Sequence, residues 1–327
     1  TTMNRVIRKD IQDMHAYAVQ PSAGLVKIDT MENPHRLPEH LQQQLGERLG
    51  RVAINRYPAE RTFELADALA RHAGMPDDCG VTLGNGSDEL ITMLSMACDV
   101  PGALIMAPVP GFVMYGMSAA LQGIRFVGVP LTPEFELDAG AMLQAIEAHR
   151  PSLLYLAYPN NPTANLWDES VIEQCVQAMG GIGGLVVMDE AYQPFAARDS
   201  MALLRRHPHV LVMRTMSKFG LAGVRIGYLI GRRELVAEID KLRPPFNVSV
   251  LNAEAGLFAI EHADAYAEQA AEIRHQFVVL RQAQRTESGI DSTEQRLGRG
   301  AEHGRAAAVV DQELQRVVEW MHALHRQ

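Results

Sequence analysis

Six short apolar runs recur between residues 103 and 230 of this 327-residue chain. Each run has the length of a β-strand, most are rich in Val, Ile or Leu, and helix-length or turn-rich segments separate most of them. Such continuous apolar runs are typical of strands buried on both faces, as in a sheet covered by helices. The pattern therefore predicts an α/β fold with a largely parallel sheet. The runs are Ala103–Ala107, Ile124–Val129, Leu153–Ala157, Leu185–Met188, Val210–Met213 and Ile226–Ile230.

The chain is longer than one hydrophobic core usually requires, so a large domain and a smaller one are expected. Residues 1–45 include three prolines and predict an extended N-terminal arm with part of the small domain. Residues 46–250 form the predicted large domain, and residues 251–327 the small one, whose character changes after about residue 284. The segments with helical patterns are Phe63–His72, Asp88–Cys98, Asn252–His262, Ala265–Arg285 and Val310–Leu324.

Charge and composition narrow the class of protein. The formal net charge of −9 argues against a nucleic-acid-binding surface, which needs a basic face. No apolar run approaches the roughly 20 residues that span a bilayer, and the first ten residues lack a secretory signal. The three cysteines, Cys79, Cys98 and Cys175, are widely spaced and predict buried thiols, with neither a disulfide nor a metal site. A cytoplasmic protein without nucleic-acid or membrane partners is expected.

Two turn-rich clusters contain residues that suit a ligand. The segment Thr82–Glu89 holds a Gly-rich turn that opens a helix, where exposed N–H groups suit a phosphate. The same turn is also typical of a plain connection in which Ser87 or Asp88 caps the helix. The segment Tyr158–Thr163 places two asparagines between two prolines, which either fixes a side-chain amide or forms an ordinary turn.

Two further clusters carry charged residues directly after apolar runs. The segment Asp189–Tyr192 begins with an acid, which is costly at the end of a buried strand unless a cation meets it. It could alternatively cap a helix. The segment Arg214–Arg225 contains a Ser217-Lys218 pair and ends on an arginine seven residues beyond the lysine. A lysine is usually a surface group, but burial between apolar segments makes it a nucleophile.

Taken in this order, the four clusters resemble the class I and II aminotransferases, which are fold-type I pyridoxal-phosphate enzymes. The resemblance spans roughly residues 5–284. It implies a large domain with a mostly parallel sheet, a smaller α+β domain and a pyridoxal 5′-phosphate cofactor. Further matches are similar to the members that exchange an amino group between L-histidinol phosphate and 2-oxoglutarate in histidine biosynthesis. These matches are Lys27–Pro34, Arg56–Pro58, Pro110–Phe112 through Tyr115, and Arg243–Asn247.

The resemblance also implies how the cofactor ring would be held. Lys218 would carry the cofactor as a Schiff base and then move a proton on the substrate. Asp189 would face the pyridinium nitrogen and keep it protonated. Asn161 and Tyr192 would hydrogen-bond the ring's O3′, and Tyr115 would stack on the ring face. The catalytic residues implied are therefore Lys218, Asp189 and Tyr192.

The phosphate would be held at the first and fourth clusters. The backbone amides around Gly86, Ser87 and Asp88 would bind its oxygens together with Ser217 and Arg225, because a guanidinium matches phosphate geometry.

Three other residues take roles near the dimer interface and the substrate in relatives. Tyr57 would reach the phosphate of the neighbouring subunit, which implies a homodimer. Tyr17 and Glu32 would lie over the substrate, and Asn161 would also bind it. For Tyr57, Tyr17 and Glu32, packing tyrosines and a surface acid are the competing interpretation.

The C-terminal segment departs from the family pattern. Relatives carry an Asn-Phe strand followed by a Leu-Arg-x-(Thr/Ser)-x-Gly segment, whose arginine binds the substrate's carboxylate or phosphate. Residues 285–327 match neither element, and the surroundings of Arg296, Arg299 and Arg305 differ, so we assign the role to none of them. Losing such a charged partner costs roughly 2–5 kcal/mol of substrate binding.

Three alternatives stay open on the sequence. The first is an aromatic amino acid aminotransferase, and the second is a pyridoxal-phosphate-dependent decarboxylase or lyase of the same fold. Both would keep the same lysine and ring acid, because substrate orientation selects the bond that breaks. The third is a catalytically impaired cofactor-binding protein with a regulatory or structural function.

Overall fold

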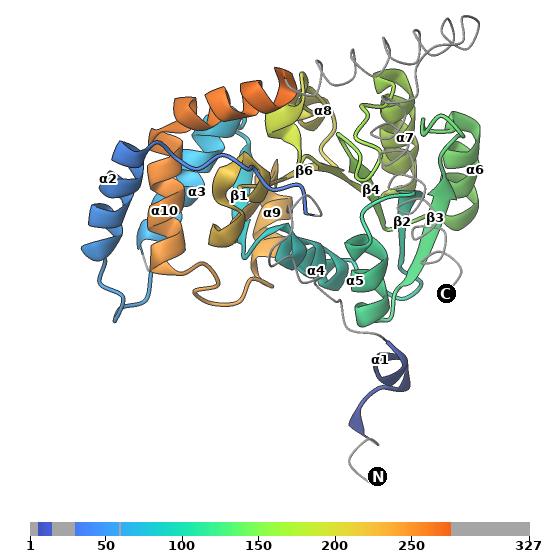
Figure 1. Ribbon diagram of the computed structural model, residues 1–327. Helices are drawn as coiled ribbons and strands as arrows, with labels where there is room; N and C mark the ends of the chain where they lie inside the picture. The colour runs from blue at the N-terminus through green and yellow to red at the C-terminus, as the bar shows by residue number, and fades with distance from the viewer. Residues whose placement is uncertain (1–5, 15–29, 59, 276–327) are drawn as a thin grey trace, which may run out of the picture. The chain divides into compact units, whose positions relative to one another are not determined.

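The computed structural model describes residues 6–14, 30–58 and 60–275 (Figure 1). Contacts divide the chain into two compact units, Thr1–Ala271 and Glu272–Gln327. The sheet and the candidate site both lie in the first unit.

A seven-stranded sheet forms the centre of this unit, with the strand order β1-β7-β6-β5-β4-β2-β3. Four neighbouring pairs are parallel, and only the two pairs that include β7 are antiparallel. The prediction of an α/β fold with a mostly parallel sheet is confirmed. The strands are β1 (Cys79–Gly84), β2 (Leu104–Val109), β3 (Arg125–Pro130), β4 (Leu153–Ala157), β5 (Leu185–Asp189), β6 (Val210–Thr215) and β7 (Gly227–Arg232).

One strand escaped the sequence prediction. The six predicted runs coincide with β2 to β7, whereas β1 was not predicted as a strand. Its sequence, CGVTLG, contains two glycines and a threonine, so it lacks the continuous large apolar residues of the others. Its place in the sheet depends on pairing along its whole length with β7, from Cys79 opposite Arg232 to Gly84 opposite Gly227.

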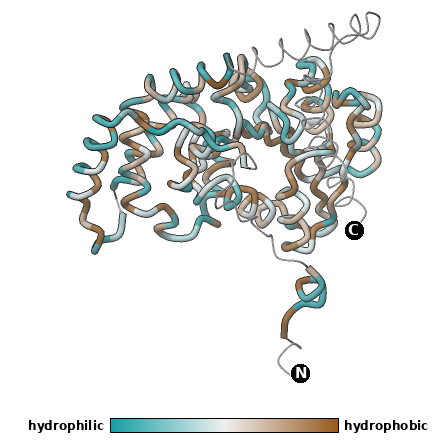
Figure 2. Tube along the Cα trace, viewed as in Figure 1, coloured by the Kyte–Doolittle hydropathy of each residue, from teal (hydrophilic) through white to brown (hydrophobic). Residues whose placement is uncertain are grey.

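Helices cover both faces of the sheet, which therefore forms the middle of three layers (Figure 1). Side chains alternate along each strand, so Leu154 and Leu156 of β4 enter one core cluster while Leu153 and Tyr155 enter the other. The first cluster includes residues of α3, α6, α7, α8 and α10, and the second includes residues of α4, α5 and α9. Figure 2 shows hydrophobic residues along the central strands and the helices that cover them.

The predicted helices agree with the observed ones where the structure describes them. Phe63–His72 lies inside α3, while Asp88–Cys98 and Asn252–His262 correspond to α4 and α10. Residues 263–275 are also helical. The helices are α1 (Lys9–Asp13), α2 (Glu39–Gly50), α3 (Glu60–Ala73), α4 (Ser87–Ala97), α5 (Met114–Gln122), α6 (Ala139–His149), α7 (Glu169–Ile182), α8 (Met201–Arg206), α9 (Arg233–Asp240) and α10 (Val250–Glu261), with short turns η2 (Gln193–Phe195), η3 (Ser217–Leu221) and η4 (Ala222–Val224).

The direction of β7 decides which segments meet at the edge of the sheet. The carboxyl ends of the parallel strands β1, β4, β5 and β6 lie at one edge. Because β7 runs the other way, its first residue lies at that same edge, where Gly227 is opposite Gly84 of β1 and Thr215 of β6. The segments after four strands and the segment before β7 therefore converge.

The described part of the predicted N-terminal arm contains α1, an extended stretch at residues 30–38 and the beginning of α2. Gln269 anchors the extended stretch, since its side chain accepts a hydrogen bond from Asn33 at 2.9 Å and donates one to the Arg36 carbonyl at 3.0 Å. The predicted domain boundaries at residues 45 and 250 stay predictions. The predicted helix Val310–Leu324 lies outside the described residues.

Within the described ranges, no helix is long and apolar enough to cross a membrane. In the same ranges, no group of His, Cys, Asp and Glu side chains is arranged to hold a metal ion. The three cysteines are buried free thiols. The cytoplasmic location stays a prediction.

Candidate active site

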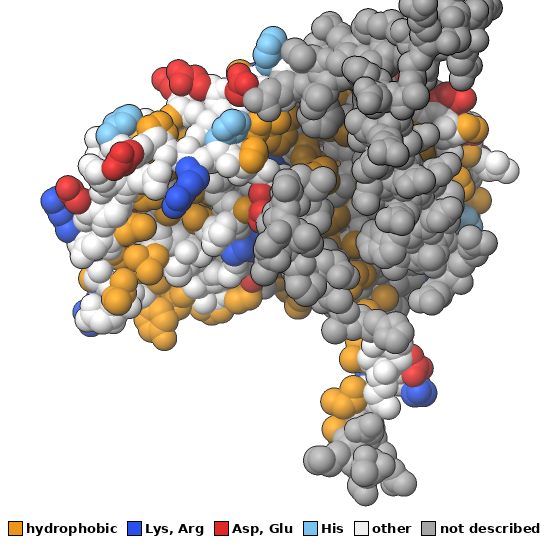
Figure 3. All heavy atoms as spheres, viewed as in Figure 1, with side chains coloured by type: hydrophobic (Ala, Val, Ile, Leu, Met, Phe, Trp, Pro, Cys, Tyr) orange, Lys and Arg blue, Asp and Glu red, His pale blue; other side chains and the backbone are white. Residues whose placement is uncertain are grey.

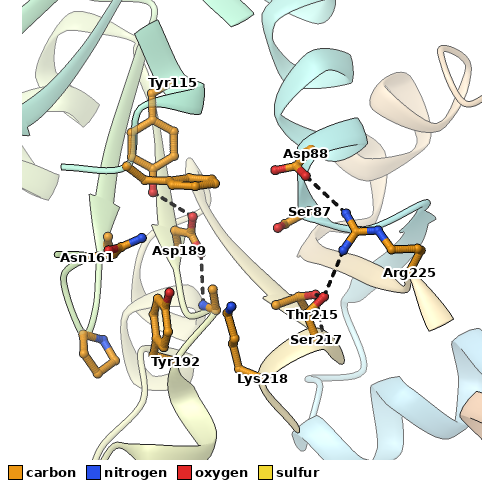
Figure 4. A pocket seen from close by; sticks show the side chains of 14 residues that line it. Ser87, Asp88, Tyr115, Asn161, Asp189, Tyr192, Thr215, Ser217, Lys218 and Arg225 are labelled. Carbon is orange, nitrogen blue, oxygen red and sulfur yellow. Dashed lines mark hydrogen bonds and ion pairs between the residues drawn. The ribbon is translucent and has the colours of Figure 1, made fainter. Parts of the chain in front are cut away.

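The four sequence clusters meet in one pocket at the carboxyl edge of the sheet (Figure 4). Nine of the predicted site residues line it: Ser87, Asp88, Tyr115, Asn161, Asp189, Tyr192, Ser217, Lys218 and Arg225. Five residues that were not predicted complete the lining: Phe112, Ala157, Pro159, Ala191 and Thr215.

Asp189 is the buried acid of this pocket. It is the last residue of β5, and only 4% of it is exposed. One carboxylate oxygen accepts a hydrogen bond from the Tyr115 hydroxyl at 2.7 Å, and the other accepts one from the Ala191 backbone N–H at 3.0 Å. Burial raises the pKa of Asp189 to about 6, although both hydrogen bonds oppose the rise. The site therefore holds a carboxylate that a cationic partner would stabilise.

Lys218 supplies the amine of the pocket. It follows β6 in the short turn η3 and is half-buried. Its Nζ donates a hydrogen bond to the Thr30 carbonyl of the extended stretch and lies 5.4 Å from the centre of the Tyr192 ring. A primary amine and a buried carboxylate thus line the same cavity. Such an amine can condense with a carbonyl carbon.

Arg225 marks the opposite end of the pocket. It lies two residues before the first residue of the reversed strand β7, which explains how it returns to the edge that Lys218 occupies. Its guanidinium lies 3.2 Å from the Asp88 carboxylate and donates to the Ser217 hydroxyl at 3.4 Å. Figure 4 shows the guanidinium between the start of α4 and the turn after β6.

The turn before α4 requires glycine. Gly86 has a φ of +78°, and a Cβ there would lie 2.5 Å from the Arg225 guanidinium nitrogen. Gly227 is packed against the same turn, since a Cβ there would lie 2.7 Å from the Ser87 backbone nitrogen. Gly86 is also the N-cap of α4, so no side chain caps the first N–H groups of that helix. Helix N–H groups, a hydroxyl and a guanidinium together suit a phosphate.

Asn161 and Tyr192 provide neutral polar groups beside the acid. Both are half-buried, and Figure 4 shows them on the Asp189 side of the pocket, away from Arg225. Burial raises the pKa of the Tyr192 phenol, and the negative charge of Asp189 adds to the rise. Tyr192 therefore keeps its proton and can donate a hydrogen bond at neutral pH.

The structure does not support the expected stacking of Tyr115 on a cofactor ring. Tyr115 is only 2% exposed, and its ring stacks on Tyr155 with centroids 4.2 Å apart and planes 7° apart. Its hydroxyl is directed at Asp189. Phe112 lines the pocket and is half-buried, so of these two rings it is the one available to a ligand. The Pro110–Tyr115 match contains both rings, and sequence spacing alone did not separate them.

A buried ion pair joins the two strands that end at the site. Arg214 of β6 donates a hydrogen bond to the Glu190 carboxylate at 2.8 Å, and both side chains are almost fully buried. The Glu190 backbone N–H also donates to the Met213 carbonyl at 2.8 Å. Glu190 directly follows Asp189, so this pair holds the end of β5, which carries Asp189, against β6, which precedes Lys218. The sequence showed both charges inside clusters but did not pair them.

Tyr57 and Glu32 do not line the pocket, although the structure describes both. Tyr57 is 77% exposed and stacks on Phe246, with ring centroids 4.4 Å apart. It lines a separate hollow beside the ends of α2 and α3. Glu32 is exposed and does not line the pocket, and Tyr17 lies outside the described residues. The predicted roles of these three residues stay predictions.

Comparison with known proteins gives a consistent set of relatives. A family model described as aminotransferase class I and II matches residues 25–296. A histidinol-phosphate aminotransferase from Methylibium petroleiphilum is 67% identical over 285 residues, which cover 87% of this chain and 77% of the relative. The protein of the same name from Polaromonas naphthalenivorans is 61% identical over 278 residues, covering 85% and 76%.

A solved structure agrees with these sequence matches. Histidinol-phosphate aminotransferase from Sinorhizobium meliloti, in complex with pyridoxal-5′-phosphate, superposes with a TM-score of 0.73 at 27% identity. The superposition covers 83% of this chain and 75% of that one.

Proposed function

Because the chain belongs to the aminotransferase class I and II family, we propose that it transfers an amino group between L-histidinol phosphate and 2-oxoglutarate with bound pyridoxal 5′-phosphate. The observation that carries the proposal is one pocket lined by the Lys218 amine, the buried Asp189 carboxylate and the Arg225 guanidinium. These are the three groups that an aldehyde, a pyridine nitrogen and a phosphate require. The relatives' printed names support the choice of substrate.

The residues present fit this cofactor at its phosphate end. Glycine at position 86 lets the Arg225 guanidinium approach the turn, and no side chain caps the first N–H groups of α4. The Arg225 guanidinium, the Ser217 hydroxyl and the backbone of Gly86, Ser87 and Asp88 would hold the phosphate.

The ring end fits equally well. When bound, pyridoxal phosphate supplies an electron sink for negative charge at the substrate carbon that bears the amino group. Asp189 would keep the ring nitrogen protonated, while Asn161 and Tyr192 would orient the ring through its hydroxyl oxygen. Phe112, rather than Tyr115, would pack on the ring face. Lys218 would hold the aldehyde carbon and move the proton at the substrate carbon.

The proposal includes a homodimer in which Tyr57 acts on the partner's site. An aromatic ring that is 77% exposed, stacked on Phe246 that is 49% exposed, favours a surface that a second subunit covers. Figure 3 shows hydrophobic side chains gathered near the lower ends of α2 and α10. Arg56 and Pro58 flank Tyr57 in the hollow beside them.

Hybrid dimers test this part of the proposal. Neither a Lys218→Ala homodimer nor a Tyr57→Ala homodimer contains a complete site. In a mixed dimer, one site regains both the native lysine and the partner's native tyrosine. We expect activity above that of either homodimer after the two variants are mixed, unfolded and refolded together. Activity no greater than the sum of the separate variants would contradict a contribution from the partner.

Glutamate production tests the reaction itself. We expect the purified protein with pyridoxal phosphate to form glutamate from 2-oxoglutarate when L-histidinol phosphate is the amino donor. Good activity with phenylalanine or tyrosine and none with the phosphate ester would identify an aromatic aminotransferase. Release of carbon dioxide would identify a decarboxylase, and cofactor binding without exchange for any donor would identify a non-catalytic protein.

A further inference from the structure

Two stacked tyrosines lie directly behind the buried acid. Tyr115 of α5 and Tyr155 of β4 are both almost fully buried, and their rings are nearly parallel with centroids 4.2 Å apart. Their hydroxyl groups differ. The Tyr115 hydroxyl donates to Asp189 at 2.7 Å, whereas the Tyr155 hydroxyl has no hydrogen-bond partner among the described residues.

The alternation of β5 explains this placement. Val187 packs in the core cluster that contains Tyr115 and Tyr155. Asp189 is two residues further along the strand, so its side chain leaves the sheet on the same face. The α5 face that packs there therefore supplies a hydroxyl to the acid, while Tyr155 supports the ring that carries it.

Each Asp189 oxygen has one donor in the described structure: the Ala191 N–H for one and the Tyr115 hydroxyl for the other. We propose that Tyr115 is a positioning residue, which fixes the orientation of the Asp189 carboxylate and keeps it ionised opposite the cofactor ring nitrogen. This inference rests on the proposed function. It assigns to Tyr115 an action through Asp189 in place of direct contact with the cofactor.

The electrostatic surroundings make this hydrogen bond important. Burial raises the pKa of Asp189, and the nearby carboxylates of Asp88 and Glu190 raise it further. The Tyr115 hydroxyl and the Ala191 N–H oppose that rise. The same pocket also contains Lys218, Tyr192 and Arg225, and Tyr155 lies on the other side of the Tyr115 ring.

Tyr115 is suited to act as a permanent donor. Burial raises the pKa of its phenol well above the ordinary value, and the charge of Asp189 adds to the rise, so it keeps its proton throughout the physiological range. Without its hydroxyl, Asp189 would bind a proton at a higher pH. A neutral acid cannot stabilise a protonated ring nitrogen, so the cofactor would lose its ionic partner.

The test compares Tyr115→Phe with Tyr155→Phe, because each substitution removes one hydroxyl from the same buried stack. The affinity for pyridoxal phosphate is measured from pH 5 to 8, and ¹⁵N NMR of ring-labelled cofactor reports protonation of the ring nitrogen. For Tyr115→Phe we expect about a tenfold or greater loss of affinity near pH 7, since a hydrogen bond to a charged group is removed. We also expect the acid limb of binding to move to higher pH. Tyr155→Phe should behave like wild type.

A double-mutant cycle with Asp189→Asn shows whether Tyr115 acts through the acid. We expect Tyr115→Phe to have much less effect when residue 189 is already neutral. Wild-type ring protonation and affinity in folded Tyr115→Phe would overturn the inference, as would equal losses in both phenylalanine variants. Additive losses in the cycle would also overturn it. If the wild-type protein fails to bind pyridoxal phosphate, the proposed function itself fails, and the inference fails with it.

Discussion

Two aromatic pairs of similar geometry have opposite surroundings. The Tyr115–Tyr155 pair and the Tyr57–Phe246 pair have ring centroids 4.2 Å and 4.4 Å apart. The first is enclosed by its own chain and touches the buried acid, whereas the second is mostly exposed. The comparison teaches that the aromatic stack beside Asp189 is formed entirely within one chain. The face that carries Tyr57 is instead open, as the proposed contact with a second subunit requires.

The largest effect is expected in the pocket that contains Lys218. Lys218→Ala should reduce amino-group exchange by more than about 1000-fold, because no other group replaces the nucleophilic amine. Glutamate formation measures the loss. Lys241→Ala is the matched control, since Lys241 is an exposed lysine paired with Glu238. Comparable losses in the two variants would remove the distinction between the pocket and the surface.

A smaller effect is expected at the phosphate end. Arg225→Ala should weaken pyridoxal phosphate binding by about ten- to hundredfold, because it removes charge-assisted hydrogen bonds. Its effect on pyridoxal, which lacks the phosphate, should be slight. Fluorescence titration with both compounds measures the difference. Equal weakening for both would show that Arg225 acts on the fold rather than on the phosphate.

A third prediction concerns the ion pairs between the helices that flank the Tyr57 loop. Glu254 of α10 accepts hydrogen bonds from Arg48 of α2 and Arg61 of α3, and these helices flank the loop that carries Tyr57. Glu254→Gln should lower the free energy of unfolding by about 1–3 kcal/mol at pH 7, since a largely buried carboxylate loses its charge beside two arginines. Urea unfolding measures the change.

The same residue predicts a pH dependence. Burial alone would raise the pKa of Glu254, but the hydrogen bonds and charges of Arg48 and Arg61 outweigh it and lower the pKa. Its stabilisation is therefore complete above the ordinary Glu pKa and is lost as the pH falls below that value. The difference in the free energy of unfolding between wild type and Glu254→Gln should therefore disappear at acidic pH. Glu261→Gln is the control, because Glu261 also pairs with Arg48 but its side chain is 52% exposed.

The smallest effect is expected from Tyr155→Phe. Its buried hydroxyl has no hydrogen-bond partner within the described ranges, and phenylalanine would keep the stack on Tyr115. The free energy of unfolding should stay within about 1 kcal/mol of wild type or rise. Thermal unfolding measures it. A large destabilisation would mean that this hydroxyl is satisfied by a buried water.

The sequence predicted the fold well where a signal was local. Continuous apolar runs identified β2 to β7, because strands buried on both faces need such residues. β1 was not predicted because its two glycines and threonine do not form a continuous apolar run. It is a strand because it pairs with β7. The reversal of β7 was also not predicted, since an apolar run carries no information about direction.

The same difference between local and long-range signals applies to the residues of the site. Lys218, Asp189 and Arg225 could be found because each sits next to a strand end within a recognisable cluster. The distinction between Phe112 and Tyr115 depends on which ring faces Tyr155, a contact between segments far apart in the sequence. The pairing of Glu190 with Arg214 has the same long-range character.

The reversal of β7 also sets a length. The amine at 218 and the guanidinium at 225 are joined by one tight connection, η3 and η4, between two adjacent strands. The distance between the lysine and the arginine that would bind a ligand is therefore set by one short loop, and not by the arrangement of separate helices. Because the loop sets this distance, inserting or deleting a residue in it would change which molecules can contact both the lysine and the arginine.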